Sequence, residues 1–197
     1  MNEEELTFKV NQIVYMKLFD ENECKEISKL YTNMIQAQSY SSSIPKFGNK
    51  LIAEQDTLVS NDDVRKSKGR CLAYDECKWI VEKLGNKTEE LNQKYFKYGN
   101  MTIDAIDILE YGISDKCDWH SDMGTTKPFS QRKISIVAFI SDRDEYEGGQ
   151  LEFMPKLKEP LKMEKGYIIA FPAHKIHRVT PVTSGIRRTF VTWLMEA

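Results

Sequence analysis

The chain has 197 residues, of which 41% are hydrophobic and 11% aromatic. This length can bury one sizeable core and leaves little for a second, so we expect a single domain over residues 1–197. The 28 basic and 30 acidic side chains nearly balance, and a net charge of −2 argues against nucleic acid or anionic lipid as a partner.

The amino terminus is acidic and lacks the basic and apolar regions of a secretory signal. The longest apolar stretch, Ile134–Ile140, falls far short of the roughly 20 residues of a membrane helix. We therefore expect a soluble, cytoplasmic protein that does not enter a membrane. The cysteines form no CxxC pair, which favours free thiols. They are Cys24, Cys71, Cys77 and Cys117.

Residues 1–100 are expected to supply supporting strands and helices and a substrate loop. Asp20 has the character of a helix N-cap, with Glu23 three residues later in the position of a capping box. Alternating apolar residues predict the strands. The expected elements are a strand at 6–10, an extended segment at 13–19, helices at 21–38 and 76–95, and a long loop at 39–70 with a candidate strand at 51–59.

Residues 101–197 change to short runs rich in Ile, Val and Phe, separated by Gly, Pro and Asp clusters, and are expected to form the catalytic core. The strands are expected at 101–111, 118–123, 132–141, 150–154, 159–163, 167–171, 175–182 and 186–195. Short strands with turns between them favour a jelly roll over an α/β sheet. The expected fold class is mainly β with flanking helices (α+β), a jelly roll or double-stranded β-helix braced by the amino-terminal helices.

The first candidate metal ligands are His120 and Asp122, which are two residues apart. On a strand, both side chains would point to the same side. A second imidazole from a distant strand would complete a two-histidine, one-carboxylate set, which leaves three adjacent positions of an octahedral iron open. By itself, the same pattern also fits a surface histidine beside a solvated aspartate.

The block from His177 to Arg187 supplies that second imidazole and a guanidinium. The planar fork of Arg187 suits a carboxylate that binds through two oxygens, although an internal ion pair or a solvent-facing position would also fit an arginine here. His174 falls in an expected loop, so His177 is preferred. Arg188 points to the opposite face of its strand from Arg187 and is expected to lie outward or ion-paired.

With these residues, the run from Tyr111 to Trp193 resembles the catalytic domain of 2-oxoglutarate and iron-dependent oxygenases of the prolyl 4-hydroxylase class. The matching features are Tyr111-Gly112, His120-x-Asp122, Arg132-Lys133-Ile134-Ser135, Tyr146-Glu147-Gly148-Gly149-x-Leu151, Gly166, Phe171-Pro172 and the block from His177 to Arg187. In the amino-terminal half, Val64-Arg65-Lys66-Ser67 lies where relatives carry an Arg-x-Ser and a substrate loop.

The resemblance implies roles for individual residues. The implied iron ligands are His120, Asp122 and His177. Arg187 is the implied partner of the distal carboxylate of 2-oxoglutarate, with Tyr111 as a hydroxyl donor to it. Candidate substrate contacts are Arg65, whose alternative is a solvated basic loop, and Trp193, on the same strand face as Arg187. Phe139 stands where some relatives have a second tyrosine, which removes one expected hydrogen bond to 2-oxoglutarate.

The implied cofactors are Fe(II), 2-oxoglutarate and O2, with ascorbate as a candidate reductant. The implied activity is hydroxylation of a prolyl residue in a peptide or protein, with conversion of 2-oxoglutarate to succinate and CO2. Asp122 argues against a halogenase, because the halogenases related to this family lack this carboxylate and bind halide in its place. The alternatives are the same chemistry on a lysyl residue, a free amino acid or an alkylated base; a non-catalytic cupin-like metal-binding module; and a structural zinc site with Cys117 as fourth ligand.

Overall fold

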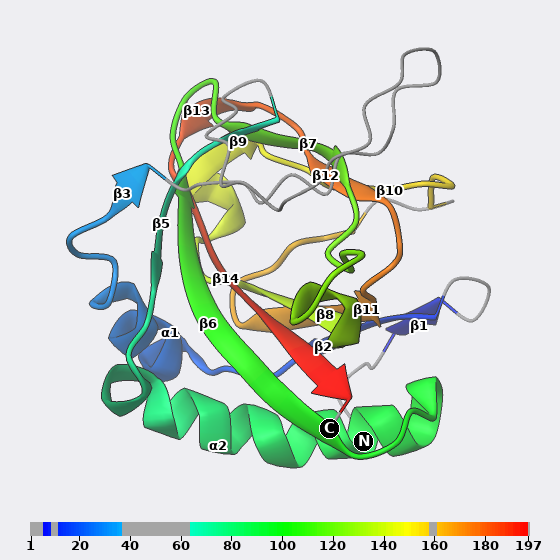
Figure 1. Cartoon of the computed structure of the whole chain (residues 1–197). Helices are drawn as coiled ribbons and strands as arrows, with labels where there is room; N and C mark the ends of the chain where they lie inside the picture. The colour runs from blue at the N-terminus through cyan, green and yellow to red at the C-terminus, as the bar shows by residue number, and fades with distance from the viewer. Residues whose placement is uncertain (1–5, 9–11, 37–63, 158–160, 197) are drawn as a thin grey trace.

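The computed structural model describes residues 6–8, 12–36, 64–157 and 161–196. Its larger sheet has eight antiparallel strands in the order β1-β2-β11-β8-β14-β6-β5-β3 (Figure 1). Their bounds are β1 Leu6–Phe8, β2 Ile13–Lys17, β11 Tyr167–Pro172, β8 Arg132–Phe139, β14 Arg187–Glu196, β6 Met101–Tyr111, β5 Lys68–Cys71 and β3 Ile35–Gln36. β14 lies between β8 and β6, in the middle of the sheet.

A smaller sheet packs against one face of the larger one. Its order is β10-β12-β7-β4, and β13 and β9 form a separate pair. The bounds are β10 Leu151–Phe153, β12 His177–Val179, β7 Lys116–His120, β4 Arg65–Lys66, β13 Val182–Gly185 and β9 Tyr146–Gly148. The expectation of a mainly β fold with flanking helices is confirmed.

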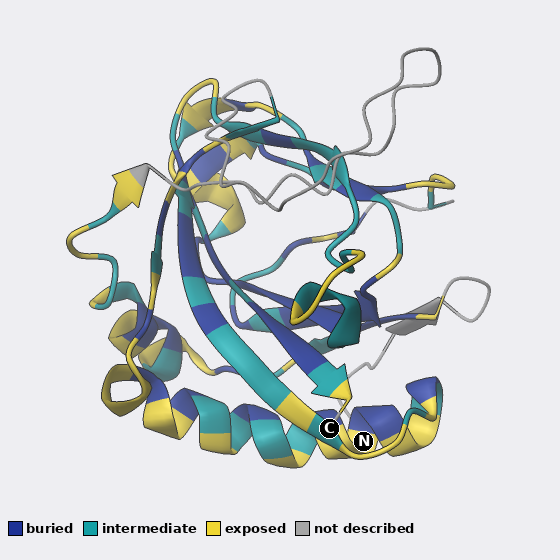
Figure 2. Ribbon diagram, in the orientation of Figure 1, coloured by how far each residue is buried: buried dark blue, intermediate teal, exposed yellow. Residues whose placement is uncertain are grey.

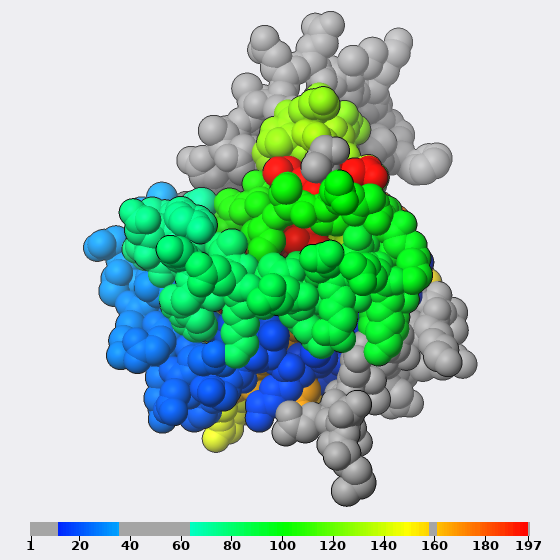
Figure 3. Space-filling view, turned by 90° about the horizontal axis from the view of Figure 1, so that it is seen from below, coloured from blue at the N-terminus to red at the C-terminus, as the bar shows by residue number. Residues whose placement is uncertain are grey.

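Two helices cover the other face of the large sheet. They are α1 (Glu21–Ser28) and α2 (Tyr74–Leu91), which continues into a π-helical turn, η1 (Asn92–Phe96). Figure 3 shows the molecule from the side of α2. Lys83 of α2 forms an ion pair with Glu23 of α1 at 2.5 Å. Short 3-10 turns, η2 (Phe129–Gln131) and η3 (Arg143–Glu145), flank β8.

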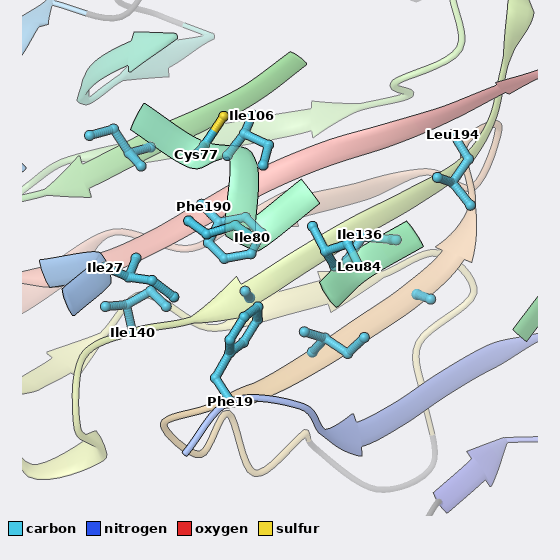
Figure 4. Packing of buried hydrophobic residues seen from close by; sticks show 14 of the residues in the cluster. Phe19, Ile27, Cys77, Ile80, Leu84, Ile106, Ile136, Ile140, Phe190 and Leu194 are labelled. Atoms are coloured by element: carbon cyan, nitrogen blue, oxygen red, sulfur yellow. The ribbon is translucent and has the colours of Figure 1, made fainter. Parts of the chain in front are cut away.

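The alternation of side chains along β14 divides the molecule into two apolar layers. Phe190 and Leu194 pack with Ile80 and Leu84 of α2, on the helix side of the sheet (Figure 4). The opposite face packs against the small sheet in a second cluster, which includes Phe171. Figure 2 shows the central strands as largely buried and the outer side of α2 as exposed. Neither face of the large sheet is therefore left to solvent at its centre.

In the amino-terminal half, the main difference from expectation is that the first helix is shorter. Asp20 caps α1, and the expected capping box with Glu23 is present, but the helix ends at Ser28 rather than at residue 38. Asn33 has a positive φ of 53°, and Ile35 pairs with Gly69 of β5 instead of continuing the helix. Sheet pairing has therefore outweighed local helical periodicity. The second helix begins two residues earlier than expected.

Among the strands, β6 matches the expected range 101–111. The range 175–182 is divided into β12 and the start of β13, and β7 ends at His120, before the expected 123. The expected strand at 159–163 is wrong for 161–163, which have no strand, and 158–160 lie outside the described residues, as does the candidate strand at 51–59. No helix within the described ranges is both long and apolar enough to cross a bilayer.

Candidate metal centre

The structure brings His120, Asp122 and His177 together. β7 and β12 are neighbours, with His177 directly across from His120. Nε2 of His120 lies 3.5 Å from Oδ1 of Asp122, and Nε2 of His177 lies 3.6 Å from Oδ2. Taking one donor atom from each residue, all three atoms lie within 4.8 Å of one another. This spacing fits three ligands of one metal ion.

Both imidazoles are oriented by their own backbone. Nδ1 of His120 lies 2.7 Å from the carbonyl oxygen of Asp118, and Nδ1 of His177 lies 2.9 Å from that of Lys175. A carbonyl oxygen can only accept, so in each neutral ring Nδ1 carries the hydrogen and Nε2 presents a lone pair. Such a partner on the outer nitrogen is the usual way in which a protein orients a histidine that binds a metal.

Asp122 follows β7 rather than lying on it, so strand alternation does not explain its position. Its backbone N–H donates to the carbonyl oxygen of Ala173 at 3.0 Å. The hydroxyl of Ser135, in β8, donates to Oδ2 of Asp122 at 2.6 Å. Sequence reasoning assigned no role to Ser135, because no spacing pattern connects a serine inside an apolar strand to this carboxylate.

The electrostatics favour an ionised carboxylate between the imidazoles. Burial disfavours the charge of Asp122, but His177, His120 and Ser135 outweigh it and hold the pKa of this carboxyl well below its usual range. Burial and the charge of His120 lower the pKa of His177 to about 4. Burial also acts to lower the pKa of His120, but Cys117 and Asp122 raise it above its usual value.

A pocket with about 430 Å³ of empty space, which is open to solvent, contains the three candidate ligands. It lies between the large and the small sheet. The side chains that line it are Arg65, Leu109, Tyr111, Cys117, His120, Asp122, Ile136, Val137, Leu151, His177, Val179, Arg187, Thr189, Val191 and Trp193. Most of these are apolar, and the charged groups are confined to the triad and two arginines.

Arg187 is 1% exposed and lines this pocket. Its Nη1 donates to Thr189 at 3.3 Å, whereas Nε and Nη2 have no hydrogen-bond partner among the described residues. Gly149 makes room for it, because a Cβ at that position would lie 2.7 Å from Cδ of Arg187. A buried guanidinium with unpaired donors is costly, and a carboxylate entering the pocket would complete it. The donor set therefore fits 2-oxoglutarate.

Tyr111 and Phe139 flank the same guanidinium. Their ring centroids lie 5.1 Å and 5.9 Å from Cζ of Arg187, and both residues are 1% exposed. Tyr111 also lines the pocket. Tyr111 therefore lines the same pocket as Arg187, while Phe139 contributes only an apolar ring beside the guanidinium.

The two candidate substrate contacts also line the pocket. Arg65, in β4, lies across from Cys117 of β7, and its buried Nε has no partner among the described residues. The indole of Trp193 is covered by the guanidinium of Arg132, at 3.5 Å from the ring centroid, and its Nε1 is likewise unpaired within the described ranges. Arg65 is therefore not a surface residue of a solvated loop.

Of the three rival residues, His174 and Arg188 do not line the pocket, whereas Cys117 does. His174 is exposed and is not part of the group of three candidate ligands. Nε of Arg188 donates to Glu110 at 2.9 Å, so this arginine is ion-paired as expected. Cys117 is a free thiol that lines the pocket, with Sγ 3.9 Å from Nε2 of His120, but it is also not in the group of candidate ligands. A tetrahedral zinc site would require a fourth ligand.

Residues 106–195 match the model of the 2OG-Fe(II) oxygenase superfamily. A PKHD-type hydroxylase of Synechococcus sp. (strain CC9902) is 33% identical over 96 residues, which are 47% of this chain and 41% of that protein. A PKHD-type hydroxylase of Hyphomonas neptunium is 37% identical over 90 residues, 44% of this chain and 40% of that protein. The chain thus spans about two fifths of the length of these relatives.

The fold is similar to that of solved prolyl hydroxylases. A Pseudomonas putida prolyl-4-hydroxylase superposes with a TM-score of 0.67 at 12% identity, covering 95% of this chain and 94% of that one. A Trichoplax adhaerens prolyl hydroxylase, in complex with a peptide fragment of the hypoxia inducible factor oxygen degradation domain, has a TM-score of 0.67 at 15% identity, covering 94% and 84%. The resemblance expected from the sequence is confirmed: residues 106–195 match the 2OG-Fe(II) oxygenase superfamily, and the chain has the double-stranded β-helix fold of prolyl hydroxylases.

Proposed function

We propose that this chain is a 2-oxoglutarate- and Fe(II)-dependent oxygenase that hydroxylates a prolyl residue of a peptide or protein. His120, Asp122 and His177 would hold the iron, and Arg187 the distal carboxylate of 2-oxoglutarate. The observation that carries this proposal is the shared pocket. Three candidate ligand atoms lie within 4.8 Å of one another, and a buried arginine with two unpaired donors lines the same pocket.

The three ligands come from one side of the pocket and would leave the remaining positions of the ion for cosubstrate and oxygen. Bound iron would supply the activation of O2 that, with 2-oxoglutarate as electron donor, inserts one oxygen atom into a C–H bond and leaves succinate and CO2. The protein supplies orientation. The fork of Arg187 and the hydroxyl of Tyr111 would fix one end of 2-oxoglutarate, and the apolar walls would keep water from the reacting carbon. Ascorbate would serve as reductant.

A prolyl substrate is supported by the resemblance to prolyl hydroxylases and by the pocket wall. Trp193 offers an apolar ring with an unpaired N–H, and Arg65 offers an unpaired donor on the opposite sheet. An amide carbonyl of a peptide could accept from either, while a pyrrolidine ring suits the aromatic surface. We further propose that residues 1–197 form one domain, in which residues 1–100 brace the catalytic core of residues 101–197.

The test measures succinate formation with Fe(II), 2-oxoglutarate, O2 and a library of proline-containing peptides, with mass spectrometry to locate added oxygen. His120→Ala and Arg187→Ala should each abolish succinate formation, while His174→Ala, at the exposed histidine, should not. If both site variants turned over normally, the site would be wrong. Oxygen found only on lysyl residues or free amino acids would reject the prolyl substrate and keep the oxygenase.

A further inference from the structure

One thiol lies inside the pocket with the candidate metal ligands. Cys117 is 3% exposed, and its Sγ lies 3.6 Å from Nδ1 and 3.9 Å from Nε2 of His120. It lines the pocket together with Asp122 and His177. Because Nε2 of His120 is the atom that would bind the metal, the thiol is within reach of any oxidant generated at that ion.

The other cysteines provide a natural contrast. Cys24 and Cys77 are buried in the layer between the large sheet and the helices, on the far side of the sheet from the pocket. Cys71 is exposed to solvent. All four are free thiols, and Cys117 alone lines the pocket. An oxidant in bulk solution would therefore meet Cys71 first, whereas one formed in the pocket would meet Cys117 first.

The pocket also contains a donor for an oxidised sulfur. Arg65 is directly opposite Cys117 in the β4–β7 pair, so both side chains are on the same face of the small sheet. The Nε of Arg65 is buried without a partner among the described residues, and two donors of the 1% exposed Arg187 are unpaired in the same pocket. An oxygen atom added to Sγ would lie on the face from which Arg65 could donate to it.

We propose that Cys117 is the site of self-oxidation when the pocket contains 2-oxoglutarate and O2 but no organic substrate. This inference rests on the proposed function. The thiol takes the place of the C–H bond: one oxygen atom of O2 enters succinate and the other forms the S–O bond of a sulfenic acid, which keeps the thiol hydrogen. 2-Oxoglutarate loses CO2 and gives two electrons, and the sulfur gives the other two, so O2 is fully reduced.

The consequence is a self-limiting site. A sulfenic oxygen on Cys117 would occupy pocket space beside His120 and hold Arg65, so substrate could not enter. Two molecules of a small thiol would reverse the change, giving back the cysteine, one disulfide and water. Turnover without substrate should therefore lose activity, and a reducing thiol should restore it.

The experiment incubates the full chain with Fe(II), 2-oxoglutarate, O2 and catalase, without peptide. Sulfenic acid is trapped with dimedone and located by peptide mass spectrometry, while succinate is measured in the same samples. We expect the adduct on Cys117, none on Cys24 or Cys77, and loss of the Cys117 adduct when 2-oxoglutarate is omitted. Dilute hydrogen peroxide without iron should instead label Cys71.

Two variants complete the test. Cys117→Ser should form succinate without the progressive loss of rate expected of the unmodified chain, and Arg65→Met should shorten the lifetime of the sulfenic acid. Succinate formation with Cys117 still reduced would overturn the inference and leave the proposed function intact. Equal labelling of Cys71 and Cys117 would also overturn it, because the oxidant would then come from solution. Absence of both succinate and adduct would also overturn the inference, and the proposed function would then be decided separately by succinate formation with the peptide library.

Discussion

Removing the hydroxyl of Ser135 should weaken metal binding without unfolding the site. Ser135 is 1% exposed, and its hydroxyl donates to Oδ2 of Asp122 at 2.6 Å. Hydrogen bonds to charged groups contribute about 1.5–3 kcal/mol. Part of that value is present without metal as well, because the carboxylate accepts the same bond in the free site. We therefore expect Ser135→Ala to lose about 1.4 kcal/mol of metal-binding free energy, which raises the dissociation constant roughly tenfold. This is at the lower end of the effects usual for residues that hydrogen-bond to metal ligands.

The assay is titration of the metal-free chain with Co(II), which reports occupancy by its visible absorption and does not depend on turnover. Ser141→Ala is the matched control. Ser141 is also buried, just after the same strand, but its hydroxyl donates to the backbone carbonyl of Ile186 rather than to a candidate ligand. This control should lose stability and keep its affinity for Co(II). Ser135→Thr, which keeps a hydroxyl, should recover most of the binding.

Two results would refute the reasoning. If Ser135→Ala bound Co(II) as tightly as the unmodified chain, the hydrogen bond would not be orienting a ligand. If Ser141→Ala weakened binding by the same factor, the effect would be one of general stability.

Three further predictions concern the binding of 2-oxoglutarate and the stability of the fold. Arg187→Lys should raise the KM for 2-oxoglutarate by at least about tenfold, because a single ammonium cannot reproduce a planar two-point contact; an unchanged KM would remove Arg187 from the carboxylate site. Gly149→Ala should have a similar effect on KM, since the new Cβ would meet Cδ of Arg187 at 2.7 Å and the backbone has a φ of 58°. Gly85→Ala in α2 is the contrast, because an added Cβ there would have no atom within 4 Å apart from the helix's own backbone and the neighbouring residues. It should only stabilise the helix, by about 0.5–1 kcal/mol. Lys165→Met should lower the melting temperature, because Lys165 joins Asp142 to α1 through two 2.9 Å ion pairs. Burial acts to lower the pKa of Lys165, but these two carboxylates raise it above its ordinary value of 10.5. The stability that the charged lysine contributes is therefore complete below pH 10.5 and is lost only as pH rises through the higher pKa of the folded state. The difference in melting temperature should thus be constant near neutral pH and shrink in strong alkali; a difference that grew with pH would contradict the sign.

The carboxyl-terminal half of the fold could be predicted because its strands carry their own signals. β6 has the expected bounds, and β14 alternates between Arg187 and Thr189 on the pocket side and Phe190 on the helix side. The first helix could not be predicted in length. Its local periodicity continues past Ser28, whereas the chain instead brings Ile35 to pair with Gly69 at the edge of the sheet, which is a contact between distant residues.

The sequence predicted which residues form the candidate site, but not which residues hydrogen-bond to them and hold them in place. The types and spacing of His120, Asp122, His177 and Arg187 indicated a metal and a carboxylate. Sequence patterns could not indicate that Ser135 would bond to one of them, because a serine inside an apolar strand has no spacing rule that connects it to a carboxylate thirteen positions earlier. Such partners are defined by three-dimensional proximity alone.

The hydrogen bonds around Asp122 also explain why the His-x-Asp spacing brings its carboxylate close to His120 although Asp122 is not on a strand. The carbonyl oxygen of Ala173, in the turn before β12, accepts from the backbone N–H groups of Asp122 and Met123, each at 3.0 Å, and from the hydroxyl of Ser121 at 3.1 Å. This single acceptor fixes the turn that carries the carboxylate to the turn that leads into His177. The candidate ligands from the two segments are therefore held to each other mainly by backbone hydrogen bonds, so that their separation does not depend on the exact side-chain packing of the pocket.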